Sequence, residues 1–200
     1  MNPITSARLP SSVEVAGAEV RVRCGFRKQI ALESLDLESR DGVMGALWLC
    51  YGTTLPDGSR SLPDVVAEHA AEAAEAAVAW HNGAWSLMRY GSGGSGAAGG
   101  ATPRPVFDWG SDACIVASDF MRFYGIDLLD PSTQMHWYRF MAYFLPLTRA
   151  GGLVAQAVAA RSPAPGQASK AERERRRQLA RAWALPPTEL ELRESALRKF

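Results

Sequence analysis

Cysteine is scarce in this sequence, with three thiols in 200 residues, at Cys24, Cys50 and Cys114. An odd and widely spaced set does not form the framework of a small disulfide-stabilised protein. A CxxC pair, which is common in structural zinc sites, does not occur. We therefore expect reduced thiols, no bound metal and a reducing compartment. Cys50 and Cys114 stand in apolar runs and are expected to be core residues.

Long hydrophobic runs are also missing. No stretch reaches the roughly 18 apolar residues of a membrane span, because the apolar run at 70–80 is interrupted by Glu72 and Glu75. Residues 1–10 lack the charged start and apolar run of a signal peptide. The sequence therefore predicts neither a membrane partner nor export, and the expected location is the cytoplasm.

Residues that commonly carry catalysis are few or poorly spaced. The histidines are His69, His81 and His136, and none has metal-ligand spacing to another. For His136, between a methionine and a tryptophan, a core histidine with one hydrogen bond is favoured over a ligand or a base. The sequence has no GxGxxG before a helix, no P-loop lysine and no GxSxG turn.

Three carboxylates, Asp108, Asp112 and Asp119, gather near one predicted helix start. Paired carboxylates act as acid and base when their surroundings separate their pKa values. Capping explains them more simply, because acids in a first helical turn complement the helix dipole. No histidine, lysine or nucleophile accompanies them at a telling distance. We therefore expect a protein that is not an enzyme and needs no cofactor.

Formal net charge is +1, but the charge is uneven along the chain. Residues 151–200 hold ten Lys or Arg and five Asp or Glu. Any partner attracted by charge is expected to meet this basic end.

Periodicity predicts a mainly α fold, a helical bundle with a small N-terminal β-hairpin. Valines alternate with charged residues between Ser12 and Arg23, and Ala16-Gly17-Ala18 supplies a short turn. Helices are expected at 26–37, 43–51, 63–80, 111–124, 132–148, 151–161 and 169–184.

Residues 91–100 contain six glycines. Glycine loses the most conformational entropy on ordering, so this segment is not expected to form a packed helix or strand. We expect a flexible linker or loop at 91–105. It would separate an N-terminal part, 1–90, from a C-terminal helical region, 106–187, which is followed by a tail, 188–200.

The aromatic segment at 135–144 is the most unusual feature. Trp137, Phe140, Met141 and Phe144 trace one helical face, and a central core helix is the simpler interpretation. Tyr138 is expected off that face. The functional alternative is a partner-binding patch that uses Trp137, Tyr138, Tyr143 and Phe144.

Arginines crowd the last predicted helix, and Arg173, Arg176 and Arg177 are the candidate partner-binding residues there. A solvated face is the simpler interpretation, because glutamates stand three or four residues before two of them. An acidic protein partner is the next choice, and nucleic acid is the least favoured.

The C-terminal half resembles the gene-product-fifteen family of phages and prophages of Gram-positive bacteria. The resemblance covers about eighty residues, Phe107–Pro186, and is carried by Phe107-Asp108-Trp109, Tyr124-Gly125-Ile126-Asp127-Leu128, His136-Trp137, Arg161-Ser162 and Ala184-Leu185-Pro186. The N-terminal half fits more loosely, through Val13-Glu14-Val15 and Gly25-Phe26-Arg27. Tyr138 stands where a second tryptophan is usual, and the glycine-rich linker departs from the family's compact pattern.

The resemblance implies a tail-assembly protein, encoded between the major tail protein and the tape-measure protein. Such proteins are similar to chaperones that bind the tape-measure protein, which is long and helical with apolar stripes. The expected partners are therefore the tape-measure protein or other tail proteins, and a homo-oligomer is compatible with this. The expected location is the host cytoplasm, with the virion tail as the alternative. The two other hypotheses are a structural tail or adaptor component and a nucleic-acid-binding regulator that uses Arg173–Arg181.

Overall fold

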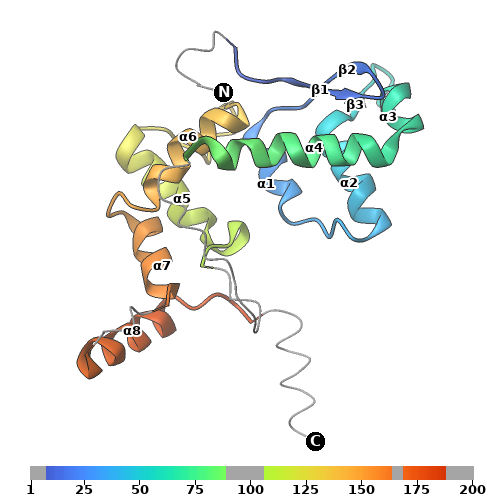
Figure 1. Cartoon of the computed structure of the whole chain (residues 1–200). Coiled ribbons are helices and arrows are strands. Elements are labelled where there is room, and N and C mark those ends of the chain that lie inside the picture. Colours follow the sequence, from blue (N-terminus) through green and yellow to red (C-terminus); the bar gives the residue numbers. More distant parts are fainter. Residues whose placement is uncertain (1–7, 89–105, 164–168, 188–200) are drawn as a thin grey trace, which may run out of the picture. The chain divides into compact units, whose positions relative to one another are not determined.

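The computed structural model describes residues 8–88, 106–163 and 169–187. They form eight α-helices and two small antiparallel hairpins (Figure 1), which confirms the predicted mainly helical class with an N-terminal hairpin. The expected linker at 91–105 and the expected tail at 188–200 lie outside the described residues. No helix in the described part is long and apolar enough to cross a membrane.

The described residues belong to two compact units. Of the described residues, unit 1 contains 8–88 and Asp127–Pro146. Unit 2 contains 106–126 and the described residues from Leu147 onward. The structure therefore differs from a division of the chain at 91–105 alone, because Asp127–Pro146 packs with the N-terminal elements. The role of 91–105 as a linker stays a prediction.

Unit 1 begins with the predicted hairpin, in which β1 (Ser12–Val15) pairs with β2 (Ala18–Arg21). The two loop residues have positive φ, 50° at Ala16 and 77° at Gly17, as tight hairpin loops require. The Ala16 amide donates to a carboxylate oxygen of Glu72, 2.7 Å away. This bond and the packing of β1 on α4 give the hairpin the support that an isolated one lacks.

The helices of unit 1 before the glycine-rich segment are α1 (Phe26–Leu32), α2 (Arg40–Tyr51), α3 (Asp64–Glu68) and α4 (Ala70–Trp85). A second hairpin, β3 (Thr53–Thr54) with β4 (Arg60–Ser61), follows α2, and a 3₁₀ turn, Ser86–Met88, follows α4. The single helix expected at 63–80 is wrong. The backbone leaves the helical region at His69, with φ −118° and ψ 47°, and separates α3 from α4.

The helix expected from residue 132 begins later, as α6 (Trp137–Leu147). The residues before it bond to the start of α1 instead: the Phe26 amide donates to the Met135 carbonyl at 3.0 Å, and the Trp137 amide to the Cys24 carbonyl at 2.6 Å. The Arg27 guanidinium also donates to the carbonyls of Leu128, Asp130 and Thr133. This clamp fixes Asp127–His136 against α1 and explains why the segment belongs to unit 1.

Unit 2 contains α5 (Trp109–Tyr124), α7 (Leu153–Arg161) and α8 (Lys170–Ala182). Asp108 caps α5, as predicted, by accepting from the Ser111 amide, and Gly125 ends the helix with φ 66°. Both α5 and α8 pack on α7. Of the residues between α7 and α8, only Ser162, Pro163 and Ser169 lie in the described part.

Candidate functional site

The aromatic helix α6 is mostly core. Trp137 and Phe144 are buried, and the Trp137 indole donates to the His81 carbonyl at 3.0 Å. The Phe140 ring stacks on Phe26 of α1, with ring centroids 5.0 Å apart, and Phe144 meets the edge of Trp85 of α4. The predicted core face is therefore confirmed, and two of the candidate partner-binding residues lie inside it.

The expectation that Tyr138 lies off the core face is wrong. Its side chain is 8% exposed, and its hydroxyl donates to the Trp80 carbonyl at 2.8 Å. At Gly83 of the same helix, α4, a Cβ would lie 2.3 Å from the Tyr138 hydroxyl oxygen. Because α4 packs along this side of α6, a second face of α6 is buried. Of the four aromatic candidates only Tyr143, 37% exposed, offers substantial surface to a partner.

His136 makes the hydrogen bonds of a core histidine. Its Nε2 lies 3.0 Å from the Pro10 carbonyl oxygen, and its Nδ1 accepts from the Tyr138 amide. The ring is therefore the neutral tautomer with hydrogen on Nε2. Burial lowers the pKa of His136, which favours the same neutral form.

A buried polar network in unit 1 was not evident in the sequence. The Gln29 amide donates to the Arg23 carbonyl, so its oxygen faces His81 Nδ1 at 2.9 Å. His81 Nε2 lies 2.8 Å from a Glu33 carboxylate oxygen. The two ring nitrogens therefore face two oxygen atoms, one of the Gln29 amide and one of the Glu33 carboxylate. The hydrogen bond from His81 lowers the pKa of Glu33. Through these bonds the network ties α1 to α4.

The thiols divide by burial. Cys50 is buried, as expected, whereas the core position predicted for Cys114 is wrong because the side chain is exposed on α5. Burial raises the pKa of both Cys24 and Cys50 to about 11. These two thiols are therefore protonated at neutral pH and are poor nucleophiles.

The three carboxylates of unit 2 stabilise helices. Asp112 accepts two hydrogen bonds from the Arg161 guanidinium, at 2.6 and 2.8 Å. Buried Asp119 accepts from the Leu153 and Val154 amides, at 3.1 and 2.9 Å, and so caps α7 from α5. The capping interpretation is confirmed for Asp108, whereas Asp112 pairs with Arg161 and Asp119 caps a different helix from its own.

Arg161 also connects α7 to the end of α8. Its Nε donates to the Trp183 carbonyl at 2.6 Å, next to the pair with Asp112. The helix α8 itself buries no residue. One arginine, 10% exposed, thus holds α5, α7 and the residue that follows α8.

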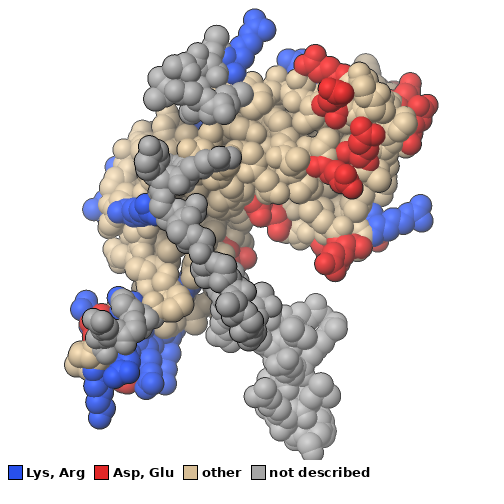
Figure 2. Space-filling view, in the orientation of Figure 1, with Lys and Arg blue, Asp and Glu red and all other residues tan. Residues whose placement is uncertain are grey.

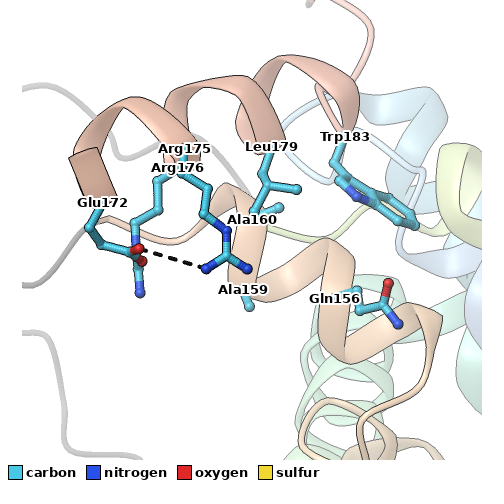
Figure 3. Close-up of a pocket in the computed structure, with 8 residues that line it drawn as sticks. All are labelled: Gln156, Ala159, Ala160, Glu172, Arg175, Arg176, Leu179 and Trp183. Atoms are coloured by element: carbon cyan, nitrogen blue, oxygen red, sulfur yellow. Dashed lines mark hydrogen bonds and ion pairs between the residues drawn. The ribbon is translucent and has the colours of Figure 1, made fainter.

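Between α7 and α8 lies a groove of about 410 Å³ (Figure 3). Its apolar lining comes from Ala159 and Ala160 of α7 and from Leu179 and Trp183 at the end of α8, and its polar lining comes from Gln156, Glu172, Arg175 and Arg176. Leu179 is 40% exposed. An apolar floor beside arginines is a surface suited to an amphipathic partner segment. We call it the α7–α8 groove.

The structure places the three arginine candidates differently. Arg176 lines the groove and bonds to Glu172 at 3.0 Å, whereas Arg173 and Arg177 do not line it. Arg177 pairs loosely with Glu174, at 3.7 Å. Figure 2 shows the Lys and Arg side chains gathered over α8. Arg175, Leu179 and Trp183 are groove residues that the sequence reasoning missed, and the signal that could have found them was the i, i+4, i+8 spacing.

A family model, described as Bacteriophage Gp15 protein, matches residues 5–185. The chain belongs to the Bacteriophage Gp15 protein family. No curated protein and no solved structure matches it.

The family match extends the resemblance, which covered the C-terminal half, over both compact units. Several residues of the motifs that carry the family resemblance stabilise the fold. Asp108 caps α5, and Arg161 pairs with Asp112. Arg27 donates to the carbonyl of Leu128, the last residue of the YGIDL segment, and to that of Asp130 after it. Within the described part of the chain, no three His, Cys, Asp or Glu side chains lie close enough to share a metal ion.

Proposed function

We propose that this phage protein is a non-enzymatic tail-assembly chaperone of the host cytoplasm, and that its α7–α8 groove binds a helical segment of the tape-measure protein. The family match supports a phage role. The observation that carries the proposal is the groove itself, in which Leu179 is 40% exposed beside Trp183 and a rim of arginines.

The groove suits one face of an amphipathic helix. Its apolar lining is small, so it would take one or two anchoring apolar side chains rather than a whole helix. Arg175 and Arg176 at the rim favour acidic residues beside those anchors and speed the encounter. The non-enzymatic part of the proposal rests on the carboxylates of α5, which cap helices or pair with Arg161.

Co-expression with the tape-measure protein tests the proposal. We expect the full-length chain to raise the soluble fraction of the tape-measure protein and to co-purify with it. Leu179→Glu should abolish both effects. The matched control is Gln178→Glu, which adds the same charge at an exposed neighbour outside the groove lining. No change in solubility and no complex with the wild-type chain would refute the chaperone role.

A structural role in the tail is the first alternative, and mass spectrometry of purified virions separates the two. A chaperone is absent from the finished particle, whereas a tail or adaptor component is present in it.

The cations of α8 favour nucleic-acid binding as a second candidate. Among the described residues, Lys170, Arg173 and Arg181 form no ion pair. Binding through them would fall steeply with salt concentration, because phosphate contacts release counterions. DNA affinity that is absent, or that shows no such fall, would eliminate this candidate.

A further inference from the structure

Three cations of unit 1 surround a second hollow, away from the aromatic helix. Arg23 follows β2, Lys28 lies on α1, and Arg60 lies on β4. Together with residues at the end of α2 they line a pocket of about 220 Å³. Its remaining lining is Trp48, Leu49, Gly52, Thr53 and Thr54.

The positive charges in this pocket lack negative partners. Among the described residues that line it none is acidic, and neither Lys28 nor Arg60 forms an ion pair with any described residue. Arg23 donates to the carbonyl of Gly52, which fixes its guanidinium at the pocket wall. Partial burial, followed by the charges of Arg23 and Arg60, lowers the pKa of Lys28. The folded chain therefore holds together like charges that repel one another.

We propose that this pocket binds the phosphate group of a small organic phosphate. Two guanidinium groups and one ammonium supply many N–H donors, a set that suits a phosphate better than a single carboxylate. The Thr54 hydroxyl adds a donor at the same wall. Trp48 and Leu49 provide an apolar surface for the organic part of the ligand, with the indole available for stacking on a flat ring.

Calorimetric titration of the full-length chain tests the site with three probes: inorganic phosphate, adenosine monophosphate and uncharged adenosine. We expect the nucleotide to bind most tightly, phosphate more weakly and adenosine not measurably. Arg60→Gln should weaken nucleotide binding about tenfold, which corresponds to a loss of about 1.4 kcal/mol in binding free energy. Arg40→Gln is the matched control, an exposed arginine of the same unit outside the pocket, and should leave binding unchanged.

Lys28→Met separates a binding role from a structural one. The substitution keeps most of the apolar stem of the side chain but removes one of the repelling charges. The free variant should therefore melt at a higher temperature than the free wild type. Added nucleotide should no longer raise the melting temperature of the variant. The proposal is overturned if neither phosphate nor nucleotide binds at millimolar concentration, or if Arg40→Gln weakens binding as much as Arg60→Gln. Equal affinity for phosphate and nucleotide would overturn the role of Trp48 and Leu49. None of these results depends on the tape-measure protein, so the two proposals fail separately.

Discussion

Arg161 and Asp112 form a bidentate ion pair in unit 2, with N–O distances of 2.6 and 2.8 Å. The Asp112 side chain is 3% exposed and the Arg161 side chain 10%. The same arginine donates to the Trp183 carbonyl, so the pair also fixes one end of the α7–α8 groove.

Arg161→Met should destabilise the protein by about 3–5 kcal/mol, because it leaves a buried carboxylate without its partner. Urea unfolding measures the loss. Adding Asp112→Leu to this variant should restore much of the stability, since the buried charge is then gone. Arg122→Met, at an exposed position of α5, is the control and should change stability little. If Arg161→Met costs no more than this control, the ion pair does not hold the unit together.

Gly152→Ala should destabilise the protein by about 1–3 kcal/mol through overpacking. A Cβ there would lie 2.3 Å from a carboxylate oxygen of Asp119, which caps the start of α7. The backbone at Gly152 has φ −81°, so alanine adds no backbone strain and the contact alone is tested.

Gly110→Ala provides the matched control for this contact. A Cβ there would meet only an Asp108 oxygen, at 3.4 Å, and alanine favours the helix. Thermal melting should therefore show the two substitutions moving in opposite directions, and the same direction for both would contradict the capping geometry.

Tyr138→Phe should cost about 1 kcal/mol, through the lost hydrogen bond to the Trp80 carbonyl. Tyr138→Ala should cost about 3–5 kcal/mol, because the ring is buried between α6 and α4. Chemical denaturation of the two variants measures both effects. If the Tyr138→Ala protein were as stable as the wild type, the burial of this side chain against α4 would be contradicted.

The Glu33 carboxylate should contribute to stability only above acidic pH. The hydrogen bond from His81 lowers its pKa from the ordinary value of 4.5. A group with a depressed folded pKa stabilises the fold above its unfolded pKa, and this stabilisation disappears as pH falls through the folded value. Wild-type protein should therefore exceed Glu33→Gln in melting temperature at pH 7, and the difference should vanish on acidification below 4.5.

Glu38→Gln is the control for this pH dependence, because Glu38 is exposed in the turn between α1 and α2 and has no bond to His81. It should track the wild type at every pH. A constant difference between wild type and Glu33→Gln from pH 7 to pH 3 would show that the carboxylate charge is not what matters.

Local patterns predicted the elements better than the contacts between them. The valine alternation and the turn at Ala16-Gly17 sufficed for the hairpin, and Asp108 and Gly125 marked the ends of α5. The start of α6 was missed because Met135 and Trp137 bond to Phe26 and Cys24, which lie more than a hundred positions earlier in the sequence. Helical propensity carries no information about such bridges.

The site depended even more on distant contacts. Tyr138 is adjacent to Trp137 in a helical pattern with one obvious apolar face, and its burial follows from α4, whose position periodicity does not give. Asp119 is a mid-helix acid whose partners are amides 34 and 35 positions away. The sequence shows that α8 is basic. Which of its arginines face α7 depends on the orientation of α8, which the bond from Arg161 to the Trp183 carbonyl helps to fix.

Two paired charge reversals on α8 test the central proposal most directly. Arg175→Glu with Arg176→Glu changes the groove rim, whereas Arg173→Glu with Arg177→Glu makes the same change in charge on the same helix outside the groove. Co-purification of the tape-measure protein with each variant is the measurement. The first pair should lose the tape-measure protein and the second should retain it. Equal loss with both pairs, or retention with both, would contradict binding in the α7–α8 groove.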